Sequence, residues 1–116
     1  MTGVVLSWEA ELEELRRREA LAEQMGGPDK VARQHGRGKM DARARLAALC
    51  DDDTFREIGK IAGKGSYDED GNLQSVLPAP FLFGKAQING RPVVATADDF
   101  TIRGGAADAG ISRKMV

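Results

Sequence analysis

The stretch FLFGKAQINGRPVVATA, residues 81–97, decides the fold of this chain. Two runs rich in apolar and β-branched residues, 81–88 and 91–97, flank the dipeptide Asn89-Gly90. Asn-Gly supplies the positive φ angles of a type I′ turn, whose twist matches that of paired strands. The sequence therefore predicts a β-hairpin, with Pro92 at the start of its second strand. The run 93–97 is typical of a strand covered on both faces.

Upstream of the hairpin the apolar residues recur at helical spacing. One stripe of a 3.6-residue helix collects Trp8, Leu12, Leu15, Ala22 and Met25. Ser7 is the predicted N-cap, and Gly26-Gly27 should end this helix. Pro28 can open a second short helix that runs to about residue 34, because proline suits the first helical position.

The rest of the chain is predicted as short elements and loops. Asp41 is a plausible N-cap for a third helix, Ala42–Cys50, with Leu46 and Leu49 on its buried side. A short strand is expected within 55–61, and residues 63–78 are expected to be a loop because Gly, Asp, Asn and Ser dominate them. Gly104-Gly105 should precede a last helix that is still open at Val116, so we interpret the chain as truncated.

Composition and charge exclude several classes of function. The single cysteine, Cys50, rules out an intramolecular disulfide framework, and a packed thiol is expected. No signal peptide or membrane span is visible, which favours a cytoplasmic protein. The net charge of −1 gives no general attraction to nucleic acid or to anionic membranes.

Charge is unevenly distributed along the chain, although the net charge is close to zero. Residues 28–45 contain six cations and two acidic residues, Asp29 and Asp41, which leaves an excess of four positive charges. The cations are Lys30, Arg33, Arg37, Lys39, Arg43 and Arg45. This basic segment is either a solvated helix face or a surface for phosphates or an acidic partner. His35 is expected to cap or pack, and no residue is assigned a catalytic or metal-binding role, because no carboxylate pair or ligand cluster has suitable spacing.

Two stretches carry a resemblance to a known family. They are MGGPDKVARQHGRGKMDARARLAALCDDDTFREI, residues 25–58, and FGKAQINGRPVVATADDFTIRGGAADAG, residues 83–110. Both are similar to the β-type carboxyltransferase subunits of biotin-dependent acyl-CoA carboxylases, such as those for propionyl-CoA and methylcrotonyl-CoA. The matching features include Gln34-His35, Gly38-Lys39, Gly90-Arg91-Pro92, Asp99-Phe100-Thr101 and Gly104-Gly105. Residues 106–110 depart from the family's usual run there, which leaves the acyl-CoA, and carboxylase versus decarboxylase, open.

The resemblance implies a fold and a reaction. It implies an α+β, or α/β, chain in which N-terminal helices precede the first part of a crotonase-like (ββα) carboxyltransferase domain. It implies transfer of carboxyl from carboxybiotin, held by a biotin carboxylase or biotin carrier partner, to the α-carbon of a short-chain acyl-CoA. A homo-oligomer of the full-length subunit is expected. The oxyanion-hole residues are expected beyond residue 116, so the isolated chain should be inactive.

The expected domain division follows the same pattern. Residues 1–62 form a helical extension with a short strand, 63–78 a loop, and 79–116 the first, incomplete ββα unit. The predicted coenzyme A contacts, all near the second Gly pair, are Phe100, Arg103, Gly104, Gly105 and Ala106. Gly104-Gly105 is also explained, without any ligand, as a simple strand-to-helix turn.

Two other functions remain open. One is a small module whose basic segment binds a polyanion such as RNA, although few aromatic residues are interleaved with the cations. The other is a non-catalytic assembly segment in which residues 1–62 hold neighbouring subunits together.

Overall fold

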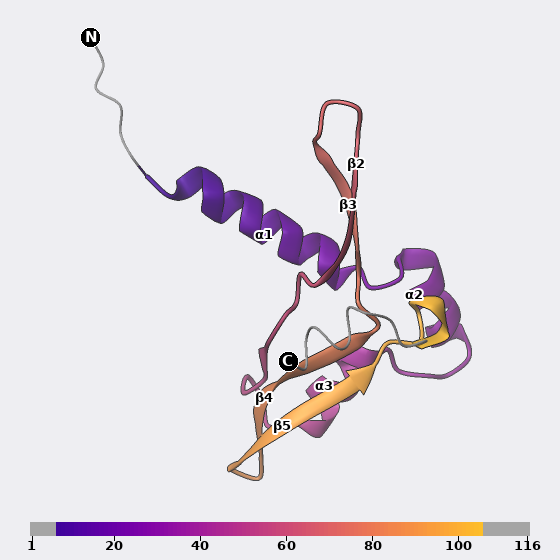
Figure 1. Cartoon of the computed structure of the whole chain (residues 1–116). Helices are drawn as coiled ribbons and strands as arrows, with labels where there is room; N and C mark the ends of the chain where they lie inside the picture. Colours follow the sequence, from indigo (N-terminus) through magenta and orange to yellow (C-terminus); the bar gives the residue numbers. More distant parts are fainter. Residues whose placement is uncertain (1–6, 106–116) are drawn as a thin grey trace.

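Helices come first in the chain and strands follow (Figure 1). The computed structural model describes residues 7–105. The helices are α1 (Glu9–Glu23), α2 (Pro28–Gly36) and α3 (Ala42–Leu49). The strands are β1 (Arg56–Glu57), β2 (Gly63–Tyr67), β3 (Leu73–Pro78), β4 (Phe81–Ile88) and β5 (Arg91–Asp98), and a short 3-10 turn, η1 (Arg103–Gly105), ends the described part.

The predicted hairpin is confirmed as β4 and β5. They pair antiparallel from Phe81 opposite Asp98 to Ile88 opposite Arg91, and β1 adds to the free edge of β4. Asn89 and Gly90 have φ angles of 52° and 77°, as a type I′ turn requires. The Asp51 carboxylate accepts hydrogen bonds from both turn amides, each at 2.8 Å, and so fixes the hairpin tip to the end of α3.

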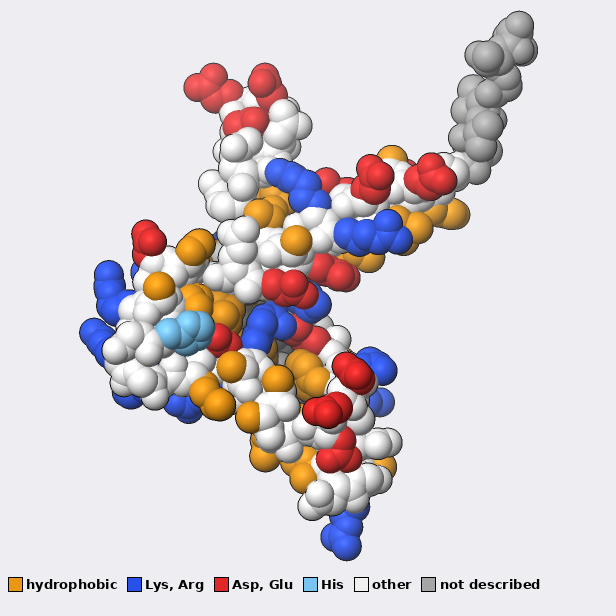
Figure 2. Space-filling view, turned by 180° about the vertical axis from the view of Figure 1, so that it is seen from behind, with side chains coloured by type: hydrophobic (Ala, Val, Ile, Leu, Met, Phe, Trp, Pro, Cys, Tyr) orange, Lys and Arg blue, Asp and Glu red, His pale blue; other side chains and the backbone are white. Residues whose placement is uncertain are grey.

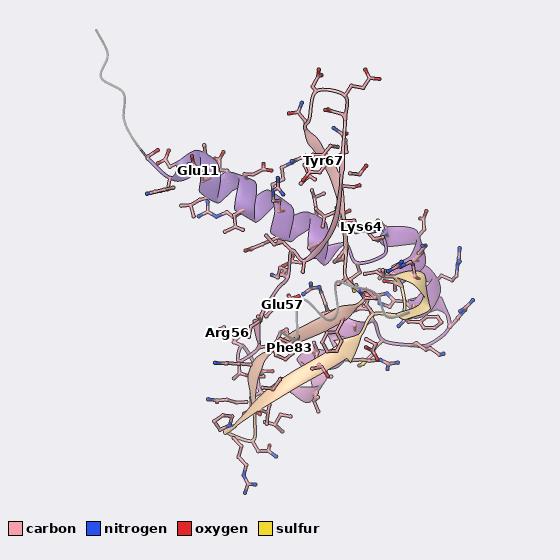
Figure 3. The ribbon with its side chains drawn as sticks, viewed as in Figure 1. Glu11, Arg56, Glu57, Lys64, Tyr67 and Phe83 are labelled. Carbon is pink, nitrogen blue, oxygen red and sulfur yellow. The ribbon has the colours of Figure 1, made fainter. Side chains whose placement is uncertain are left out.

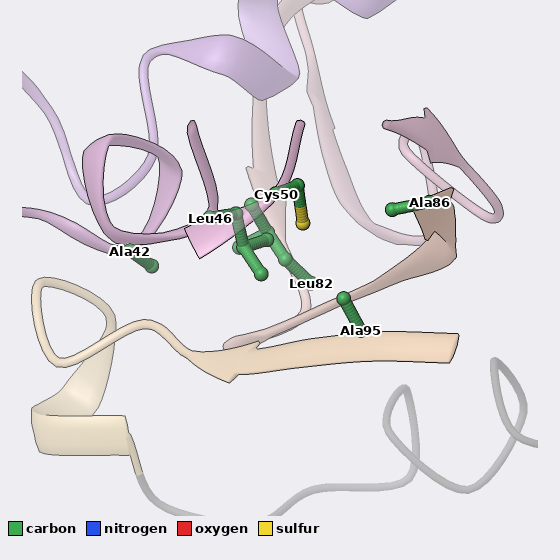
Figure 4. Packing of buried hydrophobic residues seen from close by; sticks show 6 residues of the cluster. All are labelled: Ala42, Leu46, Cys50, Leu82, Ala86 and Ala95. Carbon is green, nitrogen blue, oxygen red and sulfur yellow. The ribbon is translucent and has the colours of Figure 1, made fainter. Parts of the chain in front are cut away.

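The core lies between α3 and the β4–β5 hairpin (Figure 4). Its fully buried members are Ala42, Leu46, Cys50, Leu82, Ala86 and Ala95. Cys50 is therefore packed, as expected. Leu49 is 56% exposed, so its predicted burial is wrong. The buried row of α3 follows a strict spacing of four, through Ala42, Leu46 and Cys50, and Leu49 lies beside that row.

The predicted loop over 63–78 is wrong, because these residues form a second hairpin of β2 and β3. Asp68 folds its turn by accepting hydrogen bonds from the amides of Asp70 and Asn72, at 2.9 and 2.8 Å. Every residue of β2 is exposed, so the strand lacks the alternation of apolar residues that signals a half-buried strand. The hairpin stands beside α1, and the Arg17 guanidinium donates to the Leu73 carbonyl (Figure 1).

Helix α1 is packed over only part of its length. Ala22 and Met25 are buried, whereas the outer end of the same stripe is exposed. The predicted cap at Ser7 is wrong: Trp8 is the N-cap residue and its side chain makes no capping hydrogen bond. Val94 of β5 is 62% exposed, so the described residues cover only one face of this strand, and cover on both faces stays a prediction.

The predicted starts of α2 and α3 and the predicted short strand are confirmed. Pro28 opens α2 and Asp41 caps α3, both as expected, and a short strand does lie within 55–61. The predicted helix after Gly105 lies outside the described residues. The domain division beyond these elements stays a prediction. Over residues 7–105, no helix is long and apolar enough to cross a membrane.

Candidate functional site

The turn after β5 is held against the corner between α1 and α2. The buried Asp99 carboxylate accepts from the amide of Thr101 at 2.9 Å and from its hydroxyl at 2.6 Å. The same hydroxyl oxygen accepts from the Gly26 amide at 3.0 Å. A Cβ atom at Gly26 would lie 1.9 Å from the Thr101 carbonyl oxygen, so only glycine permits this approach. Asp99 and Thr101 of the Asp99-Phe100-Thr101 motif therefore fix this turn against Gly26.

This docking places the turn opposite α2 and creates a pocket of about 220 Å³. Its walls come from α2, the segment after it and the turn: Lys30, Arg33, Gln34, Arg37, Lys39, Phe100, Thr101, Arg103 and Gly104. Lys30, Arg33 and Arg37 share one face of α2 because their spacing is three and four residues. The sequence offered the basic segment and the Gly-Gly turn as separate candidates, and the structure makes them two walls of one pocket.

The electrostatics of this pocket are one-sided. Among the described residues its lining holds five cationic side chains and no carboxylate, in a chain whose net charge is −1. None of the ion pairs within residues 7–105 uses Lys30, Arg33, Arg37 or Lys39. Arginine and lysine donors converging on one cavity suit a phosphate or another polyanion.

A second cavity adjoins the first and shares three of its residues. It measures about 230 Å³ and is lined by Gln34, Lys39, Ala42, Arg45, Asp98 and Phe100. The Phe100 side chain lines both cavities and is 61% exposed, so its ring is accessible to a ligand. An exposed aromatic ring bordered by cations can stack on a planar group while the cations hold attached phosphates.

Gln34 orients part of this wall. Its side-chain amide donates to the Met40 carbonyl at 2.7 Å, while its Oε1 atom is buried and has no hydrogen-bond partner among residues 7–105. Sequence reasoning gave Gln34 no role of its own, although it belongs to the Gln-His pair of the resemblance. Only the fold shows that it lines both cavities.

Arg43, another member of the basic segment, serves the fold. Arg43 makes a two-pronged ion pair with Glu57, at 2.8 and 3.1 Å, and Lys60 bridges from Glu57, at 3.9 Å, to Glu23, at 2.7 Å. The Glu57 side chain is only 7% exposed and lies between α1 and the β4–β5 sheet (Figure 3). This network joins α1, α3 and β1, so Arg43 belongs to the scaffold and not to the pocket.

His35 also has a structural role, as predicted. Its Nε2 lies 2.8 Å from Asp41 Oδ2, and Asp41 Oδ1 accepts from the Ala44 amide at 2.8 Å. Burial alone would raise the pKa of Asp41, but the Ala44 amide and His35 outweigh it and lower that pKa below its usual value. The pair locks the start of α3 beside the pocket wall.

Only some of the predicted coenzyme A contacts line the cavity. Phe100, Arg103 and Gly104 line the first cavity, whereas Gly105 does not. Ala106 lies outside the described residues. The described part of the chain contains no group of three or more His, Cys, Asp or Glu that could hold a metal ion.

Comparisons with known proteins agree on one family. The propionyl-CoA carboxylase carboxyltransferase subunit of Haloferax mediterranei is 33% identical over 111 residues, covering 95% of this chain and 21% of that protein. The methylmalonyl-CoA carboxyltransferase 12S subunit of Propionibacterium freudenreichii subsp. shermanii is 38% identical over 109 residues, with 93% and 21% covered. The chain is a homologue of the acyl-CoA carboxyltransferase subunits. No family model matches it.

Solved structures support the same assignment for the fold. The transcarboxylase 12S crystal structure, with methylmalonyl-CoA and methylmalonic acid bound, superposes with a TM-score of 0.78 and 32% identity. That comparison covers 97% of this carboxyltransferase homologue and 22% of the transcarboxylase chain. A single-chain long-chain acyl-CoA carboxylase shares the fold, with a TM-score of 0.70 at 22% identity. The predicted α+β, crotonase-like fold class is therefore confirmed.

The homologue spans about a fifth of the length of the curated relatives it matches, 21% in the two described above. Their names state what those whole proteins do. The ligand-contacting residues of this carboxyltransferase homologue stay a prediction.

Proposed function

We propose that this chain contributes the coenzyme A phosphate site of an acyl-CoA carboxyltransferase subunit. The observation that carries the proposal is the pocket between α2 and the 99–104 turn, to which residues 7–105 contribute five cations and no carboxylate. Coenzyme A is a polyanion with a planar base, and the pocket offers converging cations together with the exposed Phe100 ring. The predicted contacts Phe100, Arg103 and Gly104 all border this space.

The whole subunit would transfer carboxyl from carboxybiotin to the α-carbon of a short-chain acyl-CoA of the propionyl-CoA kind. Biotin would reach it as the carboxylated group on a biotin carboxylase or biotin carrier partner, and is therefore a substrate. Carboxybiotin carries a single carboxylate, whereas coenzyme A carries several phosphate charges, so we assign the pocket with its five cations to coenzyme A. The 116-residue chain alone would bind coenzyme A without transferring carboxyl.

Titration calorimetry of the 116-residue chain with coenzyme A tests the proposal. Pantetheine, which lacks the phosphates, should bind at least about tenfold more weakly, because charge-assisted contacts are each worth roughly 1.5–3 kcal/mol. Arg33→Ala should weaken coenzyme A binding about tenfold for the same reason. Phe100→Ala should weaken it at least about fivefold, because stacking of a base on an aromatic ring is worth roughly 1–3 kcal/mol.

Lys85→Ala is the matched control. It removes one cation from β4, where Lys85 lies opposite Arg56 of β1. Figure 3 shows Arg56 on the side of the molecule away from α2. Its affinity for coenzyme A should equal that of the wild type. Equal affinity for pantetheine and coenzyme A, or tighter binding of an RNA oligonucleotide than of coenzyme A, would contradict the proposal.

A further inference from the structure

Helix α1 carries an apolar stripe that the described chain covers only at one end. Trp8, Leu12 and Leu15 are 76%, 45% and 41% exposed, whereas Ala22 and Met25 on the same stripe are buried. These outer residues, Trp8, Leu12 and Leu15, form what we call the outer stripe. Figure 2 shows hydrophobic side chains along one edge of the helix that projects from the body. An exposed apolar patch of this kind, flanked by charges, is typical of a protein interface.

Charges beside the outer stripe are arranged with opposite signs along the helix. Residues seven apart lie on the same flank of a helix, so Glu9 and Arg16 share one flank, and Glu11 and Arg18 share the other. On both flanks the acidic residue is nearer the N-terminus. Figure 3 shows Glu11 on the outer half of α1, beyond the β2–β3 hairpin. A partner helix with the reverse order of charges would match both flanks.

That partner is a second copy of α1 running in the opposite direction. We propose that two copies of this chain pair through antiparallel α1 helices, with Leu12 of one copy opposite Leu15 of the other. In this register Glu9 lies beside Arg16 of the second copy and Glu11 beside its Arg18. Two-fold symmetry doubles each contact, as in any self-complementary interface.

The packing of the inner half of α1 excludes the parallel alternative. The second half of the stripe is occupied by the chain's own body, and the β2–β3 hairpin lies against α1, where Arg17 donates to Leu73. Parallel helices would bring the two bodies and the two hairpins to the same end. Antiparallel helices overlap chiefly through their outer halves and keep the bodies at opposite ends. This surface is separate from the cationic pocket, so the inference stands without the proposed function.

Sedimentation equilibrium of the 116-residue chain at low salt tests the pairing. The wild type should show a reversible monomer–dimer equilibrium. Leu12→Glu should weaken dimerisation at least about tenfold, because it buries a charge at the centre of the interface. Leu12 is 45% exposed in the single chain, so the variant should keep the wild-type circular dichroism spectrum, which is measured alongside.

Charge reversal distinguishes this register from nonspecific association. Glu9→Arg and Arg16→Glu should each weaken the dimer several-fold, and the double variant should restore it, because the swapped charges again match. Glu13→Arg is the control: Glu13 lies on the opposite face, and its reversal should leave the dimer unchanged. A chain that stays monomeric at about 200 μM, where a dimer with a Kd of about 200 μM or tighter would be well populated, overturns the proposal. So does a double variant that fails to restore association.

Discussion

Gly26 is the residue on which the shape of the pocket depends most directly. Its amide donates to the Thr101 hydroxyl, and the chain passes so close to Thr101 that a Cβ atom would lie 1.9 Å from its carbonyl oxygen. We expect Gly26→Ala to destabilise the chain by about 2 kcal/mol or more, since backbone atoms must move to relieve the overlap. Urea unfolding followed by circular dichroism measures this change.

Gly36→Ala is the control for that substitution. Gly36 is the last residue of α2, and an added Cβ would meet no atom within 4 Å. Alanine there should leave stability unchanged or raise it by up to about 1 kcal/mol, the difference in helix propensity. If both variants behaved alike, the close contact between Gly26 and Thr101 would not be the cause.

The role of a single residue could be predicted from sequence where its hydrogen-bond partners are close to it in the chain. Asp41 could be predicted as a cap because capping is decided within three residues, and its carboxylate does accept from Ala44. The roles of Asp51 and Thr101 could not be predicted in the same way. Asp51 holds the amides of Asn89 and Gly90, which are 38 and 39 residues away, and Thr101 meets Gly26 across 75 residues.

At the scale of the element, helix α3 depends on the ionisation of its cap. The folded-state pKa of Asp41 is lowered, so its contribution to stability is present above the unfolded pKa of about 3.9 and is lost as pH falls through the folded value. The unfolding free energy of the wild type should therefore exceed that of Asp41→Asn at pH 7, and this difference should shrink below about pH 4. Chemical denaturation at several pH values gives this difference.

Asp52→Asn provides the matched comparison for that pH series. Asp52 is exposed, and its removal should leave the unfolding free energy nearly unchanged at every pH. A difference between wild type and Asp41→Asn that stayed constant down to pH 3 would contradict the role assigned to the Asp41 charge.

The two hairpins show why elements differ in predictability. In β4 and β5, a type I′ dipeptide lies between apolar runs, so turn and strands point to the same structure. In β2 and β3, the turn is built by Asp68 side-chain contacts and every residue of β2 is exposed. Nothing in the pattern of 63–67 separates a strand from a loop, because β2 pairs through backbone bonds and none of its side chains is buried.

At the scale of the whole molecule, the main finding is that two distant segments build one site. The basic segment and the turn after β5 are separated by the entire sheet in sequence, yet they form one lining. The sequence could nominate both and could not join them, because their meeting depends on the Gly26–Thr101 contact. The basic segment is also divided by the fold: Arg43 pairs with Glu57, while Lys30, Arg33 and Arg37 face the pocket.

The last prediction follows from this separation of charge. Acidic side chains gather at the hairpin tip, at 68–70, and on the first half of α1, while five cations line the pocket of a chain whose net charge is −1 (Figure 2). Coenzyme A binding should therefore weaken with salt, although the chain as a whole repels anions slightly. Raising sodium chloride from about 50 to 500 mM shortens the screening length roughly threefold, from about 14 to 4 Å, and should raise the Kd about tenfold or more. Calorimetry across this range tests it, with Arg33→Ala expected to show a shallower dependence than the wild type and Lys85→Ala the same dependence. A Kd that did not change with salt would mean that the cations of α2 are not what holds the ligand.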